Sequence, residues 1–180
     1  MNESSGAKTV SAGSKVKRAV VRTSLLATGV TFELASRFSR DLKDEIADWP
    51  EGLVFTMGAL PSGPYMSVKK EGNRIRYLGA GMKDPDVAIL FKNLDAALLM
   101  FTGQIGTPAA AAQHRFIVHG NISTSMKISR ALSLVQMFLF PGFILKKTFK
   151  TPPRFTASQM ATKGIIMAAL APALLWNAAK

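Results

Sequence analysis

Apolar positions recur at helical spacing early in the chain. Between residues 14 and 47 they fall three or four residues apart, as on one face of an amphipathic helix, and basic residues fill much of the remainder. The stretch Trp49-Pro50-Glu51-Gly52 ends this pattern, because proline and glycine both interrupt helices. Gly29 is the weakest helix former inside the stretch, so it is the expected point of any break into two helices.

Short apolar segments rich in β-branched and aromatic residues follow, separated by turns of proline, glycine, asparagine and aspartate. This pattern predicts strands at 53–60, 65–70, 74–81, 87–91 and 115–119. The loop Glu71-Gly72-Asn73 between the second and third segments is short and contains glycine, which indicates a β-hairpin.

Helical patterns return in the second half of the chain. They predict helices at 94–101, 107–113 and 122–140, and a last helix that begins at Thr156 or Ser158 and runs to Trp176. Asn93 is the expected N-cap of the first of these, and Pro108 fits the first turn of the second. Strands first follow one another and then alternate with helices, so the predicted fold class is α+β, with a mainly antiparallel sheet of about five strands covered on one face.

The same patterns suggest four regions along the chain. We expect a disordered leader at 1–13, a helical segment at 14–49, the α+β domain at 50–140, and a basic linker with an apolar helix at 141–180. No secretory signal is expected, and no apolar run reaches the length that spans a bilayer.

Charge is distributed unevenly. The net charge is +12, and none of the 11 acidic residues follows Asp95. A field of one sign attracts polyanions, either nucleic acid or an anionic lipid surface. The basic residues of the second half are scattered among long apolar stretches and do not form a dense stripe with exposed aromatics, which disfavours nucleic-acid binding.

Residue types that carry out catalysis are scarce. The chain has no cysteine and none of the common catalytic or phosphate-binding motifs. His114 and His119 fit a helix end and a strand end, while Asp84, Asp86 and Asp95 fit turns and a helix cap. We therefore expect neither an enzyme, nor a metal site, nor a cofactor.

The segment 94–145 is unusually rich in leucine, phenylalanine, methionine, isoleucine and alanine. One interpretation is that all of it is core. The other is that flexible methionine and leucine side chains line a cavity for an adaptable apolar ligand.

The run NLDAALLMFTGQIGTPAAAAQHRFIVHGNISTSMKISRAL resembles the latter half of the sterol carrier protein 2 family. That family has a short helix ending in Gly-Lys, a second short helix begun near proline, a strand, a Gly-Asn or Gly-Asp turn, and a helix rich in alanine and methionine. The matching positions here are Gly103-Gln104, Thr107-Pro108, 115–118, Gly120-Asn121 and Met126-Lys127. Residues 65–91 fit the family's hairpin and following strand, so the resemblance covers about residues 50–140.

Two departures from the family pattern stand next to each other. Ala111 and Ala112 replace Phe-Met, and His114 replaces glycine. Alanine in place of phenylalanine predicts a wider cavity at Ala111. Histidine in place of glycine predicts a helix end without the usual left-handed glycine.

The resemblance implies a bacterial-type, non-enzymatic lipid carrier whose sheet and helices enclose an apolar tunnel for sterols, acyl chains or isoprenoid lipids. The expected cavity wall is Leu94, Leu98, Phe101, Ile105, Ala111, Phe116, Val118, Met126, Leu132, Val135 and Leu139. Each of these side chains also fits an ordinary core position.

The scarcity of acids then predicts a peripheral association with an anionic membrane, on its cytoplasmic side. Candidate membrane contacts are Phe143, Lys146, Lys147, Lys150, Arg154 and Trp176, with Phe149 and Phe155 beside them. The last helix is either such an anchor or a lid packed on the domain.

An alternative function is that of a non-catalytic accessory subunit of a membrane-associated complex of lipid or quinone metabolism. Its protein partner would then be a lipid-metabolising enzyme.

Overall fold

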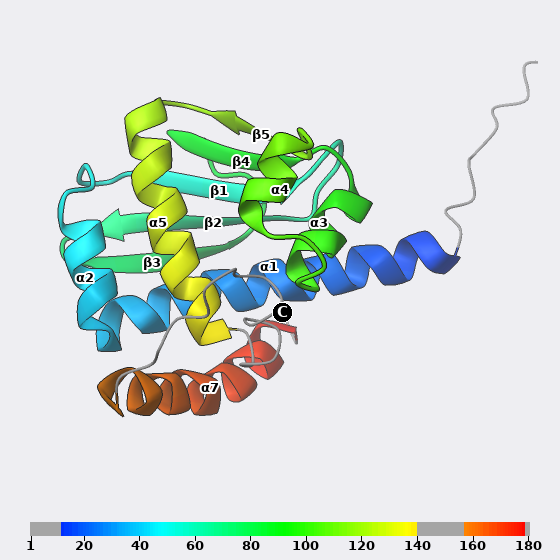
Figure 1. The fold of residues 1–180 in the computed structure, drawn as a ribbon. Coiled ribbons are helices and arrows are strands. Elements are labelled where there is room, and N and C mark those ends of the chain that lie inside the picture. Colours follow the sequence, from blue (N-terminus) through cyan, green and yellow to red (C-terminus); the bar gives the residue numbers. More distant parts are fainter. Residues whose placement is uncertain (1–11, 140–156, 179–180) are drawn as a thin grey trace, which may run out of the picture.

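A mixed five-stranded sheet forms the centre of the computed structural model, which describes residues 12–139 and 157–178. The strand order is β3-β2-β1-β4-β5, and β1–β4 is the parallel pair among the neighbouring strands, while the other neighbours pair antiparallel (Figure 1). The strands are β1 (Val54–Ala59), β2 (Tyr65–Glu71), β3 (Arg74–Ala80), β4 (Val87–Phe91) and β5 (Phe116–His119). The prediction of an α+β fold with a mainly antiparallel sheet is confirmed.

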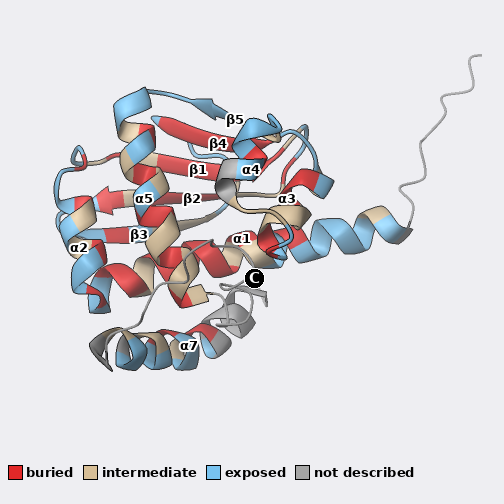
Figure 2. Cartoon of the chain, viewed as in Figure 1, coloured by how far each residue is buried: buried red, intermediate tan, exposed pale blue. Residues whose placement is uncertain are grey.

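Helices lie on one side of this sheet (Figure 1). They are α1 (Ala12–Phe38), α2 (Arg40–Ala47), α3 (Leu94–Phe101), α4 (Thr107–Ala112), α5 (Ile122–Leu139) and α7 (Ala157–Ala178). Helix α5 crosses the strands, α3 and α4 lie beside it, and α1 runs below them (Figure 1). The first turns of α1 are exposed, whereas its later turns are buried against β3, β2, α3 and α5 (Figure 2).

The break in the N-terminal helical stretch lies at Ser39 rather than at Gly29. Ser39 has extended backbone angles (φ −93°, ψ 123°), and its side chain accepts a hydrogen bond from the backbone N–H of Leu42, so it caps α2. Gly29 stays inside α1 because the Tyr77 ring packs against it. A Cβ at this position would lie 2.6 Å from Tyr77 Cδ2. The prediction of a break at Gly29 was wrong, because the packing of Tyr77 against α1 leaves no room for a side chain at this position.

The core lies between the sheet and its helices. Phe55 and Met57 of β1 point to this side together with Val68 of β2. The Phe32 ring of α1 packs against Phe55 at 6.4 Å and against Trp49 at 6.2 Å between centroids. Burial of these rings fixes α1 and the loop after α2 to the sheet.

The opposite face of the sheet is crossed by residues 81–86, which connect β3 to β4. Both strands run in the same direction, so the connection returns along the length of the sheet. Ser67 Oγ donates to the carbonyl of Gly81 (2.8 Å) and pairs with Thr56 Oγ1 (2.7 Å). At the other end, the Asp86 carboxylate accepts from the N–H of Val54 (2.8 Å). Asp86 therefore has the turn role expected from the sequence.

Helix α7 packs against α1 and α5, with Ile166 and Leu170 buried. It exposes Met160, Ile165 and Met167 on its other side. Burial lowers the pKa of Lys163, whose ammonium group donates to the carbonyl of Met137 (2.9 Å). None of the helices in the described ranges is long and apolar enough to cross a membrane.

Candidate functional site

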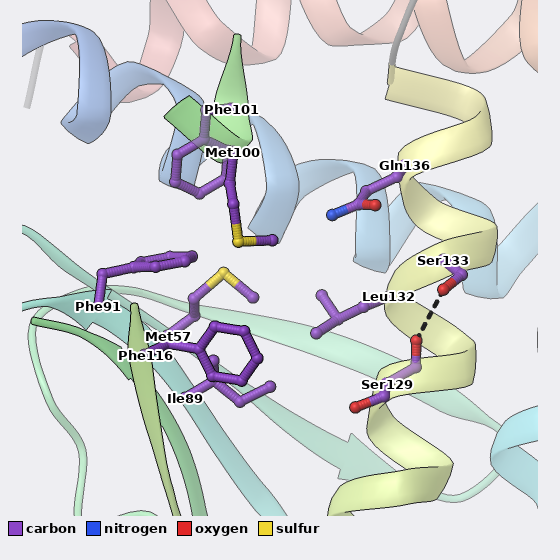
Figure 3. Close-up of a pocket in the computed structure, with 10 residues that line it drawn as sticks. All are labelled: Met57, Ile89, Phe91, Met100, Phe101, Phe116, Ser129, Leu132, Ser133 and Gln136. Carbon is purple, nitrogen blue, oxygen red and sulfur yellow. Dashed lines mark hydrogen bonds between the residues drawn. The ribbon is translucent and has the colours of Figure 1, made fainter. Parts of the chain in front are cut away.

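An apolar pocket lies between the sheet and helices α3 and α5 (Figure 3). Its free volume is about 40 Å³, and its lining is mostly apolar. The lining residues are Met57, Ile89, Phe91, Met100, Phe101, Phe116, Ser129, Leu132, Ser133 and Gln136. No charged side chain lines this pocket in the part of the chain that the structure describes.

Three neighbouring strands make the floor of the pocket. Met57 of β1 is in register with Ile89 of β4, and Phe91 of β4 is in register with Phe116 of β5. Residues in register point to the same face, so these side chains all face the helices. The Phe91 ring meets Phe101 and Phe116 edge to face, at 5.7 and 6.3 Å between centroids.

Helix α5 supplies the opposite wall. Ser129, Leu132, Ser133 and Gln136 follow one another at spacings of three, one and three residues, and so share one side of the helix. The two serine hydroxyls donate to carbonyls four residues earlier, at 2.9 and 3.0 Å. The Gln136 amide points toward Met100 across the pocket (Figure 3).

The pocket is much smaller than the tunnel that the resemblance implies. A free volume of about 40 Å³ holds roughly one water molecule, whereas ligand sites usually measure about 300–1,000 Å³. Met57, Met100 and Leu132 therefore have to move before a lipid can enter. Unbranched methionine side chains change rotamer more easily than other large apolar residues.

A wider depression of about 400 Å³ lies elsewhere, at Pro50–Leu53, Asp86 and Asn121. It is open to solvent, and Glu51 and Asp86 place two carboxylates in its wall. An apolar ligand gains little burial there, so the smaller pocket is the better candidate site.

The predicted wall residues fall into three groups. Phe101, Phe116 and Leu132 line the pocket. Val135 is fully buried in the core beside it, while Leu94, Leu98, Ile105 and Leu139 are partly buried and do not line it. Ala111, Val118 and Met126 are exposed and do not line it.

Two of the exposed residues continue the lining outward. Val118 follows Phe116 by two positions and points to the same face of β5, with 43% of its surface exposed. Ile122 and Met126 precede Ser129 and Ser133 by seven positions, two helical turns, and are 81% and 60% exposed. These three residues, which we call the apolar rim, lie on the pocket-facing sides of β5 and α5.

Sequence reasoning missed most of the floor and the polar part of the wall. All five residues of β4 are buried, so its pattern does not show which face of the strand lines the pocket. Ser129, Ser133 and Gln136 could have been found from their helical spacing relative to Leu132.

The ionisable residues considered above lie away from this pocket. Asp95 in the first turn of α3 pairs with Lys17 at 2.7 Å, and His119 is exposed at the end of β5. His114 is exposed and itself adopts the left-handed conformation (φ 50°) in place of the family's glycine. The described ranges contain no cluster of potential metal ligands.

The predicted membrane contacts fall mostly outside the described residues. Phe143, Lys146, Lys147, Phe149, Lys150, Arg154 and Phe155 all lie outside them. The backbone of Trp176 belongs to α7, and its side chain is outside the described part. In the described residues α7 packs on α1 and α5 and contributes nothing to the pocket lining.

No protein-family model and no curated protein matches the sequence. Among solved structures, the chain is similar to a ubiquinone synthesis protein described as UbiJ-SCP2, at 12% identity over 65% of this chain and 96% of that chain, with a TM-score of 0.42. It is also similar to the sterol carrier protein domain 2 of Helicoverpa armigera (15% identity, 60% and 84% covered, TM-score 0.41). A third is a conserved hypothetical protein of Thermus thermophilus, described as possibly a sterol carrier protein (16% identity, 61% and 82% covered, TM-score 0.46). The descriptions of the first two name SCP2 or the sterol carrier protein domain 2, and the description of the third names a possible sterol carrier protein.

Proposed function

We propose that the protein binds an apolar lipid in the pocket between the sheet, α3 and α5, and carries it or presents it to an enzyme. The observation that supports this proposal is the lining itself. Seven of the ten lining residues are apolar, and two of these are methionines that can move aside. A non-enzymatic role fits a lining of aromatic, aliphatic, hydroxyl and amide groups.

Burial of the ligand supplies the driving force for binding. Each methylene group that leaves water contributes about 0.8 kcal/mol, so a chain of ten contributes about 8 kcal/mol before the cost of association. Part of this energy opens the pocket. The apolar rim of Val118, Ile122 and Met126 offers a route along which the lipid stays in contact with apolar surface.

Native mass spectrometry of the purified protein, followed by organic extraction, tests the proposal. We expect a stoichiometric apolar adduct, which extraction identifies by lipid class. A clean mass without adduct, together with no uptake of added fluorescent fatty acid or sterol, would favour the accessory-subunit function instead.

We also propose that the protein works at an anionic membrane surface, where apolar lipids are stored. The net charge of +12 and the basic residues Lys146 and Lys147 next to an apolar stretch support this. Each lysine near such a surface contributes about 1 kcal/mol to membrane binding.

Replacing both Lys146 and Lys147 by glutamine is therefore expected to weaken binding to anionic vesicles about thirtyfold in a flotation assay.

The matched control removes the same charge elsewhere, with Lys69→Gln and Lys83→Gln. If the two double variants lose the same affinity, binding follows net charge alone and the proposed contact at Lys146 and Lys147 is wrong. If neither loses affinity, the membrane proposal fails.

A further inference from the structure

The single amide in the pocket wall has no partner in the described structure. Gln136 is partly buried, its side chain points into the pocket, and no residue of the described ranges hydrogen-bonds to it. An amide offers a carbonyl acceptor and two N–H donors from one position. It can therefore bind a hydroxyl group or a carbonyl group of a ligand equally well.

The other polar groups of the pocket wall are less able to donate a hydrogen bond to a ligand. The hydroxyl protons of Ser129 and Ser133 are used by carbonyls of their own helix. Their oxygens still carry lone pairs, so they accept a hydrogen bond from a ligand but donate none to an anion. Among the polar residues of this wall, Gln136 is thus the one that can hydrogen-bond both to a hydroxyl group and to a carbonyl group of a ligand.

The electrostatics of the pocket disfavour an ionised ligand. No cation lines the pocket within the described ranges, and an ionised carboxylate buried without a partner is strongly unfavourable. Helix α3 also ends here, with Met100 and Phe101 in its last turn. The C-terminal end of a helix carries partial negative charge, which repels an anion.

We infer that Gln136 makes the pocket selective for a neutral lipid with a hydroxyl or carbonyl end group, such as a sterol, a long-chain alcohol or a lipid ketone, over an ionised fatty acid. This inference rests on the proposed function of the pocket. It names both the class of ligand and the side chain that recognises it.

Three ligands of one chain length test this selectivity. Dodecane, dodecanol and dodecanoate are compared by displacement of the neutral fluorescent probe aminoanthracene from the full-length protein at about pH 8, where a carboxylic acid is ionised. We expect dodecanol to bind at least twentyfold more tightly than dodecanoate. Gln136→Met, which keeps the side-chain volume, is expected to weaken dodecanol about fivefold and to leave dodecane unchanged.

Two further variants complete the experiment. Ser123→Met changes an exposed polar residue of the same helix and is expected to leave all three affinities as they are. Gln136→Leu repeats the test with a second apolar side chain. A variant is compared only after its circular dichroism spectrum and melting temperature match those of the unchanged protein.

The outcomes separate the inference from the proposal beneath it. If neither the probe nor any of the three ligands binds, the pocket does not hold lipids and the proposed function fails. If all three bind and Gln136→Met changes none of them, the pocket holds lipids but Gln136 does not select them. Tighter binding of dodecanoate than of dodecanol also overturns the inference.

Discussion

Replacing Ser129 with tryptophan is expected to abolish lipid uptake. Ser129 lies on the pocket-facing side of α5, two helical turns before Gln136, and lines the pocket from that side. An indole at this position occupies a space in which the free volume is only about 40 Å³. We expect occupancy in native mass spectra to fall below detection and affinity for a fluorescent lipid to drop at least a hundredfold, or about 2.7 kcal/mol.

The same substitution on another side of the helix provides the control. Ser123 is exposed near the start of α5, so Ser123→Trp adds the same indole away from the pocket. Overpacking at Ser129 is expected to cost about 1–3 kcal/mol of stability, which thermal unfolding measures. Ser129→Leu is the milder variant if the indole prevents folding. Equal lipid uptake by folded Ser129→Trp and Ser123→Trp would place the ligand outside this pocket.

Replacing Gly120 with alanine is expected to destabilise the protein by about 3 kcal/mol. Two effects add. The backbone at Gly120 has φ +105°, which side-chain-bearing residues rarely adopt, at a cost of about 1–2 kcal/mol. A Cβ would also contact the carbonyl oxygen of Asp86 and approach Val87 Cα to 3.1 Å. These are backbone atoms, so β4 or β5 has to shift, which costs about 1–3 kcal/mol more.

Gly72 separates the two effects. It too has a positive φ (+59°), but no atom lies within 4 Å of the place where a Cβ would stand. Gly72→Ala is therefore expected to lose only about 1 kcal/mol in urea unfolding. If Gly120→Ala loses no more stability than Gly72→Ala, the turn after β5 tolerates a Cβ close to the backbone of Asp86 and Val87.

Local signals in the sequence were sufficient to predict most of the elements. β4 and α3 begin and end at the predicted residues, because a proline-containing turn precedes β4 and Asn93 caps α3. The break at Ser39 also had a local signal, a serine with Asp41 in the following turn, but the glycine gave the stronger one. Only the structure shows that Tyr77, far along the chain, covers that glycine.

The site was harder to predict than the fold. Phe101, Phe116 and Leu132 were predicted because they stand in segments that the family resemblance covers. Met57 and Ile89 meet only because β4 joins β1 in parallel, through a connection that crosses the far face of the sheet. Sequence patterns identify buried strands but not which of them become neighbours, so this part of the floor needed the structure.

The position of α1 has a consequence for how the protein is made. Val21, Leu25 and Phe32 are fully buried, yet the elements that bury α1 are β2, β3, α3, α5 and α7, all of which follow it in the chain. On the ribosome the first helix therefore emerges before the surfaces that cover it exist. A nascent chain released before residue 139 retains an uncovered apolar helix, and such surfaces promote aggregation. Binding of a chaperone to the exposed first helix would therefore lower the aggregation of such partial chains.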